Sequence, residues 1–141
     1  MLQQTTVQAV IPYFTRFLTR WPQLTDLAKA DAEDVLNEWA GLGYYSRARN
    51  LIKCARLINA EFGGVWPQTS AELRKLPGIG PYTADAIAAI AFEHRVVPLD
   101  GNIERVAARF FGIRMPLPAA KPELKNKSQE FLDPDYPPSY T

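Results

Sequence analysis

The stretch LPGIGPYTADAI, residues 76–87, decides the fold, because it ends one helix and starts another within a few residues. Gly78 can take the left-handed conformation that closes a helix, and Pro81 has the fixed φ that suits the first turn of the next one. Ile79 can point inward between them as an apolar anchor. The stretch therefore predicts a tight helix-hairpin-helix over about residues 70–92.

The same corner has the chemistry of a phosphate-binding turn. Gly78 and Gly80 carry no side chains, so a backbone phosphate can approach the free amides, with the positive end of the second helix dipole behind them. Such a contact grips DNA without reading its sequence. A bare G-x-G is more often an ordinary helix corner, and a dinucleotide fingerprint is disfavoured because no strand precedes it and a third glycine is absent. The full string is much more specific than a bare G-x-G.

Outside this stretch, apolar residues recur at helical spacing and strand-like alternation is scarce, so we expect an all-α fold. Asp31 begins a helix that Gly41 and Gly43 end, and Thr69 with Glu72 makes a capping box for another. The helix that Thr69 caps is expected over about residues 70–76. Further helices are expected over about residues 5–20, 24–30, 46–62, 84–92, 102–111 and 122–131, with an extended segment at 95–99.

The bulk composition narrows the function classes. The 141 residues fit one domain, and the net charge of +1 is far from the basic balance that by itself marks a nucleic-acid binder. Cys54 is the single cysteine, which excludes an internal disulfide, and no Cys/His cluster is present to hold a metal ion. No apolar run is long enough to span a bilayer and no signal-peptide pattern occurs, so we expect a cytoplasmic protein with no membrane partner.

Four stretches together resemble a known family. They are MLQQT at 1–5, GLGYYSRARN at 41–50, LPGIGPYTADAI at 76–87 and VPLDGNIERV at 97–106. In this order and spacing they are similar to the helix-hairpin-helix DNA glycosylases, and within them to the MutY-type adenine DNA glycosylases.

The resemblance implies a fold, a function and a partner. The fold is a helix-hairpin-helix glycosylase six-helix barrel over residues 1–113, followed at 114–141 by only the poorly anchored start of a second, iron-sulfur domain. The function is base-excision DNA repair, in which an adenine mispaired with oxidised guanine is removed. The partner is double-stranded DNA that carries this mispair, bound by a protein that is a monomer at full length and works at the bacterial nucleoid.

Hydrolysis of a purine N-glycosidic bond builds positive charge on the sugar. A carboxylate beside the sugar stabilises this charge. Asp100 follows the extended segment and precedes a helix, and the resemblance places the family's catalytic aspartate at this position. An aspartate in D-G-N is more commonly a helix N-cap. Because Asn102 is equally able to cap, we expect Asp100 to be left available for catalysis. If the Asp100 carboxylate instead pointed away from the hollow beside the hairpin and packed against its own helix start, the repair-enzyme assignment would lose its mechanism.

The departing base also needs a proton, and the residue that supplies it is missing. The resemblance places the catalytic glutamate two residues before Met1, and the four-cysteine motif that holds a [4Fe-4S] cluster beyond the other end. We therefore expect a fragment that is inactive alone, binds no cofactor, and would have the cluster only at full length. Tyr82 stands where the bifunctional endonuclease III branch has a Schiff-base lysine. The resemblance thus implies monofunctional hydrolysis by water, while an ordinary packing role for Tyr82 stays open.

A base in duplex DNA must leave the stack before it can react, and the gap must be filled. By resemblance, Gln4 and Tyr44 wedge into the duplex, and Gln3 and Thr5 lie near the opposing oxidised guanine. Core packing is an alternative for Tyr44.

The DNA backbone needs its own contacts, and two regions are candidates for them. Arg47 and Arg49 can contact phosphates, although a solvated helix end explains them nearly as well. The amides of Gly78, Gly80 and Thr83 are better candidates, and in the family the carbonyls of this hairpin also hold a monovalent cation. A non-catalytic helix-hairpin-helix DNA-binding module is the competing hypothesis, but it gives no reason for LDGN at this distance from the hairpin.

Overall fold

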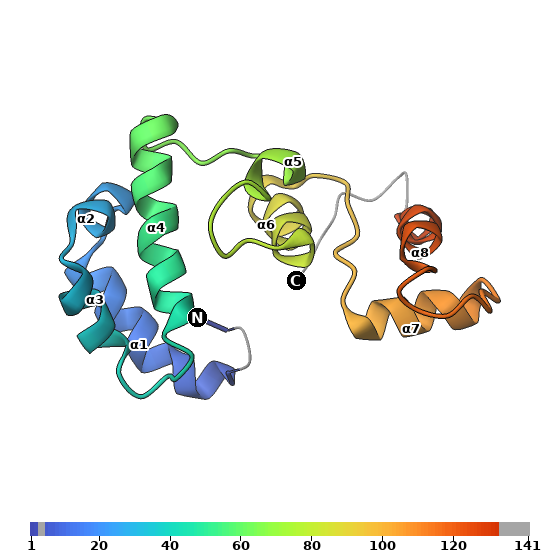
Figure 1. The fold of residues 1–141 in the computed structure, drawn as a ribbon, viewed down its shortest axis with the longest axis horizontal. Helices are drawn as coiled ribbons and strands as arrows, with labels where there is room; N and C mark the ends of the chain where they lie inside the picture. The colour runs from blue at the N-terminus through green and yellow to red at the C-terminus, as the bar shows by residue number, and fades with distance from the viewer. Residues whose placement is uncertain (3–4, 133–141) are drawn as a thin grey trace. The chain divides into compact units, whose positions relative to one another are not determined.

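The computed structural model describes residues 1–2 and 5–132, and over these ranges the chain is built from helices, turns and loops without a strand. The predicted all-α class is confirmed (Figure 1). The helices are α1 Val7–Arg20, α2 Leu24–Lys29, α3 Ala32–Trp39, α4 Ser46–Glu61, α5 Ser70–Leu73, α6 Pro81–Phe92, α7 Gly101–Phe110 and α8 Lys121–Ser128, followed by the short 3-10 helix η1 Gln129–Phe131.

These residues group into two compact units. The first contains Met1–Pro67 together with Leu76–Gly78, and the second contains Gln68–Lys75 together with the described residues from Ile79 onward. The predicted domain boundary at residue 113 stays a prediction.

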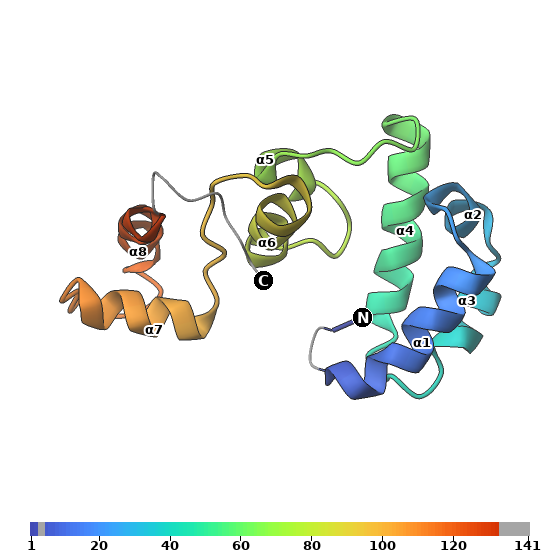
Figure 2. The same cartoon turned by 180° about the vertical axis from the view of Figure 1, so that it is seen from behind.

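The first unit is built around α4. Both α2 and α3 pack on this long helix and α1 packs on α3, an arrangement that is visible from the front and from behind (Figures 1 and 2). Its core is apolar and aromatic, with the Trp39 ring 1% exposed and packed edge-on against Phe17 at 5.9 Å between centroids. The buried members of this cluster are Val10, Phe17, Val35, Trp39, Leu42, Ala48 and Ile52.

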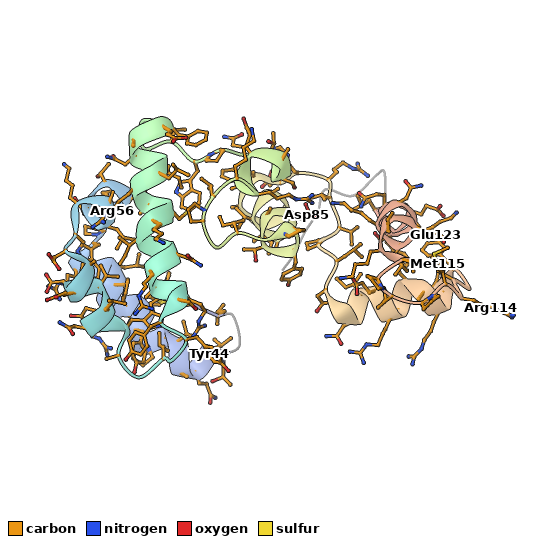
Figure 3. The ribbon with its side chains drawn as sticks, in the orientation of Figure 1. Tyr44, Arg56, Asp85, Arg114, Met115 and Glu123 are labelled. Carbon is orange, nitrogen blue, oxygen red and sulfur yellow. The ribbon has the colours of Figure 1, made fainter. Side chains whose placement is uncertain are left out.

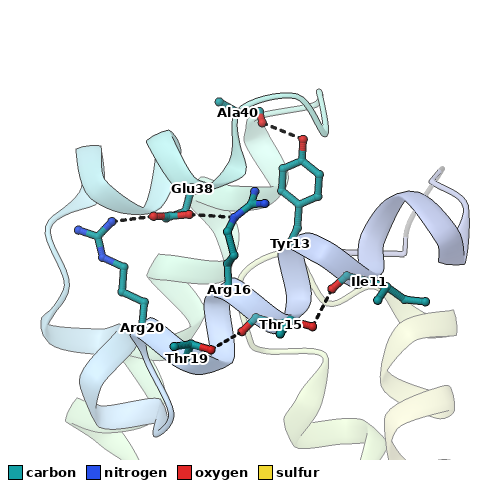
Figure 4. Close-up of polar contacts among 8 residues, drawn as sticks. All are labelled: Ile11, Tyr13, Thr15, Arg16, Thr19, Arg20, Glu38 and Ala40. Carbon is teal, nitrogen blue, oxygen red and sulfur yellow. Dashed lines mark hydrogen bonds and ion pairs between the residues drawn. The ribbon is translucent and has the colours of Figure 1, made fainter.

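Polar contacts on the surface tie α1 to α3 and to the residue after it (Figure 4). Glu38 lies between two arginines of α1, with its carboxylate oxygens 3.3 Å from Arg16 Nε and 3.0 Å from Arg20 Nη1. Near the end of α3, the Tyr13 hydroxyl donates to the carbonyl of Ala40 over 3.0 Å. These bonds fix the point at which the chain leaves α3 for the turn that follows.

The second unit holds two helix pairs, because α5 packs on α6 and α7 packs on α8. Ala107 of α7 and Leu124 of α8 are buried against each other in a small core that also includes Ala120. α8 is therefore packed on α7, while the predicted poorly anchored segment over 114–141 stays a prediction. The final residues DPDYPPSYT, 133–141, lie outside the described residues.

Helix starts follow the sequence signals more closely than helix ends do. Asp31 caps α3 by accepting from the Glu33 amide at 2.8 Å, as predicted. Thr69 Oγ1 accepts from the Glu72 amide, as the predicted capping box requires, but the Glu72 carboxylate accepts from the Thr69 hydroxyl at 2.7 Å and not from the Thr69 amide. However, α5 ends at Leu73, three residues earlier than predicted.

No helix in the described ranges is both long enough and apolar enough to cross a membrane.

Candidate functional site

The corner between α5 and α6 has the backbone predicted for it. Gly78 is in the left-handed region, with φ at +79°. A Cβ at Gly78 would lie 2.7 Å from the Cβ of Asn50, which is closer than two carbon atoms approach. Leu76, two residues earlier, is 3% exposed and anchors the chain just before the turn. Glycine is thus required at 78 both by the backbone angle and by the neighbouring side chain.

The start of α6 is open. Gly80 is its N-cap, Pro81 is the first helical residue as predicted, and no side chain of the described residues caps this start. A Cβ built at Gly80 meets no atom within 4 Å. The amides at positions 82 and 83 are therefore left without a side-chain cap at the positive end of a helix of 12 residues.

Two side chains follow directly on α6. Tyr82 is 49% exposed, and Thr83 is half-buried. An exposed phenol at position 82 is not a core residue, but the alternative that Tyr82 packs beside the hairpin stays open. Tyr82 also has no amine with which to form a Schiff base.

A buried ion cluster holds the same helix, and the sequence reasoning missed it. Asp85 lies on α6 (Figure 3). Its side chain is 5% exposed and lies 3.0 Å from Arg74 Nη2 and 3.1 Å from Lys125 Nζ. Burial by itself would raise the pKa of Asp85, but hydrogen bonds from Ser70, Lys125 and Arg74 outweigh it and lower the pKa below its usual value of 3.8. The signal in the sequence was a lone acid in the otherwise apolar run TADAIAAIAF.

Asp100 is the N-cap of α7. Its Oδ1 accepts from the backbone amides of Asn102 at 2.9 Å and Ile103 at 2.8 Å. Its Oδ2 accepts from the Asn102 side-chain amide at 3.3 Å. The expectation that Asn102 would cap and leave Asp100 unengaged is wrong. A carboxylate has more acceptor sites than these three bonds use, so the cap fixes the orientation of Asp100 without consuming its charge.

Tyr44 lies in the turn between α3 and α4, which covers residues 41–45 (Figure 3). Its ring is 64% exposed and its φ is +49°, so core packing is excluded and its backbone is left-handed. The Arg47 guanidinium lies 5.5 Å from the centre of this ring and donates to Thr5 Oγ1 over 3.2 Å. The predicted contact of Arg47 with phosphates stays a prediction, and the structure does not favour it, because the guanidinium already donates to protein oxygens.

The structure thus brings together three of the predicted residues, Thr5, Tyr44 and Arg47, at one end of the first unit. Gly78 belongs to the same unit, while Gly80, Tyr82, Thr83 and Asp100 belong to the second. Gln3 and Gln4 lie outside the described residues.

In the described part of the chain, no three or more His, Cys, Asp or Glu side chains lie together so that they could hold a metal ion. Cys54 is buried, and this burial raises the pKa of its thiol to about 11, so it is an unreactive core residue.

Comparison with protein families gives a match over nearly the whole chain. The family described as "HhH-GPD superfamily base excision DNA repair protein" matches residues 1–134. Among curated proteins, the adenine DNA glycosylase of Buchnera aphidicola subsp. Baizongia pistaciae is 46% identical over 115 residues, which is 82% of this chain and 33% of that protein. The adenine DNA glycosylase of Homo sapiens is 45% identical over 140 residues, 97% of this chain and 26% of that protein. The chain spans about a third or less of the length of these relatives.

Solved structures give the same fold. A thermostable thymine-DNA glycosylase superposes with a TM-score of 0.82 at 24% identity, over 94% of this chain and 62% of that chain. A trapped endonuclease III–DNA covalent intermediate superposes with a TM-score of 0.78, also at 24% identity and over the same shares of the two chains. At this identity the likeness establishes the fold alone.

Proposed function

Because the chain belongs to the HhH-GPD superfamily of base excision DNA repair proteins, we propose that it is the DNA-gripping part of an adenine DNA glycosylase. The observation that carries the proposal is the 46% identity, over 82% of the chain, to a relative of that name. The substrate would be duplex DNA with an adenine opposite an oxidised guanine. The reaction would be hydrolysis of the N-glycosidic bond by water, in a cytoplasmic protein that works at the nucleoid as a monomer.

The hairpin supplies the grip on the DNA backbone. Open space at Gly80 and the absence of a capping side chain at the start of α6 allow a phosphate oxygen to reach the amides at positions 82 and 83. A contact with a phosphate does not depend on the DNA sequence. A protein that searches DNA for rare lesions needs such contacts. The formal charge of +1 does not oppose this grip, because the contact uses backbone dipoles and few charged side chains.

Asp100 supplies the negative charge beside the sugar. Its Oδ1 is fixed by two amides of α7, so the carboxylate is already oriented before substrate arrives, as electrostatic stabilisation of a cationic transition state demands. Tyr82 in place of a lysine leaves water as the nucleophile. We assign no residue of this chain as the proton donor for the departing adenine.

An iron-sulfur cluster does not fit the described residues. Cys54 is the only cysteine of the chain and is buried, whereas a [4Fe-4S] cluster takes four thiolates. We therefore assign any cluster to other segments of the full-length protein, and no step proposed for this chain passes through it.

The test compares two aspartates that have the same local role. Asp100 and Asp31 are both helix N-caps, and asparagine caps as well as aspartate does, so Asp→Asn removes the charge and keeps the cap. We call "the extended protein" this chain with the segments that precede and follow the matched region in its relatives. In the extended protein, Asp100→Asn should lower adenine release from an oxoguanine:adenine duplex on the order of 10²–10³-fold, while Asp31→Asn leaves release unchanged.

Adenine release is measured as strand breakage at the resulting abasic site, and duplex affinity by fluorescence polarisation. Full activity of Asp100→Asn would remove the assigned role of this carboxylate. Tight duplex binding with no adenine release by the native extended protein would favour the non-catalytic DNA-binding module.

A further inference from the structure

The turn of residues 41–45 contains backbone that an L-residue rarely adopts. Gly41, Gly43 and Tyr44 have φ values of +101°, +67° and +49°. For the two glycines this conformation is costless, but Tyr44 has a Cβ that crowds its own carbonyl there. A tyrosine left-handed in a turn persists only where its surroundings hold it, and such residues gather at functional sites.

The group that holds this turn is the Arg47 guanidinium. Its Nη2 donates to the carbonyl oxygens of Leu42 at 3.0 Å and Gly43 at 3.3 Å, the two residues before Tyr44. Its Nη1 donates to the Met1 carbonyl at 2.8 Å and to Thr5 Oγ1 at 3.2 Å. One planar fork therefore bonds the turn and the chain before α1 at the same time.

Two aromatic rings flank the same guanidinium. The Arg47 Cζ is 5.4 Å from the centre of the Trp39 ring and 5.5 Å from that of Tyr44. Trp39 is buried, and its Nε1 donates to the Gly43 carbonyl over 3.0 Å. Arg47 is thus fixed to the core on one side and touches the exposed Tyr44 ring on the other.

The Tyr44 ring itself adds little to the core, because 64% of it is exposed. The hydrogen bonds of Arg47 surround the left-handed backbone of Tyr44. Burial of the Tyr44 ring does not explain them, because most of that ring is exposed. We propose that Arg47 is a positioning residue, which sets the angle at which Tyr44 projects into DNA and acts through Tyr44 and not through a phosphate. The inference rests on the proposed function, in which Tyr44 fills the space left by the extruded adenine.

Arg47→Lys separates the two possible roles of Arg47, which are binding a phosphate and positioning Tyr44. Lysine keeps the positive charge but is a point donor that cannot reproduce the fork. If Arg47 bound a phosphate, Arg47→Lys would leave base extrusion near native. If it positions Tyr44, Arg47→Lys should lower extrusion about tenfold, as Tyr44→Ala does, because base–aromatic stacking is lost in both.

The experiment is a double-mutant cycle in the extended protein. Base extrusion is read as the fluorescence rise of 2-aminopurine placed at the adenine position opposite oxoguanine, titrated with Arg47→Lys, Tyr44→Ala and the double variant. Arg56→Lys is the matched control, since Arg56 lies on the same helix and its guanidinium also donates to backbone carbonyls, those of Ala28 and Ala30. The expected result is that the double variant loses no more extrusion than Tyr44→Ala alone.

Losses that multiply in the double variant, or native extrusion by Arg47→Lys, would overturn the positioning role. Should circular dichroism show that Arg47→Lys is unfolded, Arg47→Gln replaces it in the same cycle, because its planar amide also donates two N–H bonds. Absence of any fluorescence rise with the native extended protein would count against the proposed function itself, and the inference would fall with it.

Discussion

Two segments that carry candidate DNA-contacting residues are the turn of residues 41–45 and the hairpin between α5 and α6. These two segments are held by side chains of opposite charge. The turn of residues 41–45 is held by a cation, because Arg47 donates to its carbonyls. The hairpin helices α5 and α6 are held by an anion, because Asp85 of α6 accepts from Arg74, one residue beyond α5. The guanidinium group of an arginine has several N–H donors and can bond more than one carbonyl of a turn. A carboxylate has several acceptor sites and can bond more than one basic side chain of neighbouring helices.

The two segments also differ in what keeps their backbone left-handed. At Tyr44 a side-chain network holds a residue that resists the conformation, whereas at Gly78 the missing Cβ permits it without help. The turn therefore depends on specific polar bonds, and the hairpin corner depends on steric fit. The comparison predicts different responses to substitution and to acid.

The largest effect is expected at the hairpin corner. Gly78→Ala forces an L-residue into φ +79° and drives its Cβ into Asn50, at 2.7 Å. Left-handed backbone and overpacking together should lower the free energy of unfolding by about 3 kcal/mol, measured by urea denaturation.

Gly80→Ala is the matched control two residues away. It has a φ of −82° and no atom within 4 Å of the added Cβ, so the free energy of unfolding should stay near native. If DNA phosphate approaches this residue, Gly80→Ala nevertheless weakens duplex binding. Equal destabilisation by the two substitutions would mean that steric fit at 78 does not control the corner.

Much of this architecture was predictable because its signals are local. Asp31, Thr69, Gly78 and Pro81 each act within one turn of the backbone, and each does what the sequence predicted. The apolar spacing gave the positions of the helices in the same way.

The rest depends on contacts between residues distant in sequence, or on competition between neighbours. The bond from Lys125 to Asp85 joins residues 40 apart, so a local pattern could not predict it. Asp100 and Asn102 were both able to cap α7, and only the structure shows that Asp100 does. The end of α6 at Phe92 was predicted, but the left-handed position after it, which Glu93 and not a glycine takes with φ +55°, was not.

A smaller effect is expected at the anion that holds the hairpin helices. Asp85→Asn keeps the shape of the side chain but removes charged hydrogen bonds to Arg74 and Lys125, whose side chains are 37% and 43% exposed and can regain water. We expect a loss of about 2 kcal/mol at pH 7 by urea denaturation. Asp34→Asn, which alters an exposed carboxylate, is the control.

The pH dependence of that loss follows from the direction of the pKa. The folded-state pKa of Asp85 lies below its usual value of 3.8, so its contribution is complete above pH 3.8 and is lost as pH falls through the folded pKa. The difference in unfolding free energy between native protein and Asp85→Asn should therefore shrink below pH 3.8. A difference that grows in acid would show that the charged form of Asp85 destabilises the fold, and it would break the comparison with Arg47.

The smallest effect on the free energy of unfolding is expected for the surface ion pairs of the first unit. Glu38 bonds Arg16 and Arg20 as Asp85 bonds Arg74 and Lys125, but the arginine side chains are 51% and 40% exposed and Glu38 is 25% exposed. Water and salt screen such pairs, so Glu38→Gln should destabilise less than Asp85→Asn, and its effect should fade as salt rises. Urea denaturation of both variants at low and high sodium chloride checks this. A salt-insensitive loss at Glu38 as large as that at Asp85 would show that the number of ionic bonds, and not their burial, determines how strongly a charge holds this fold.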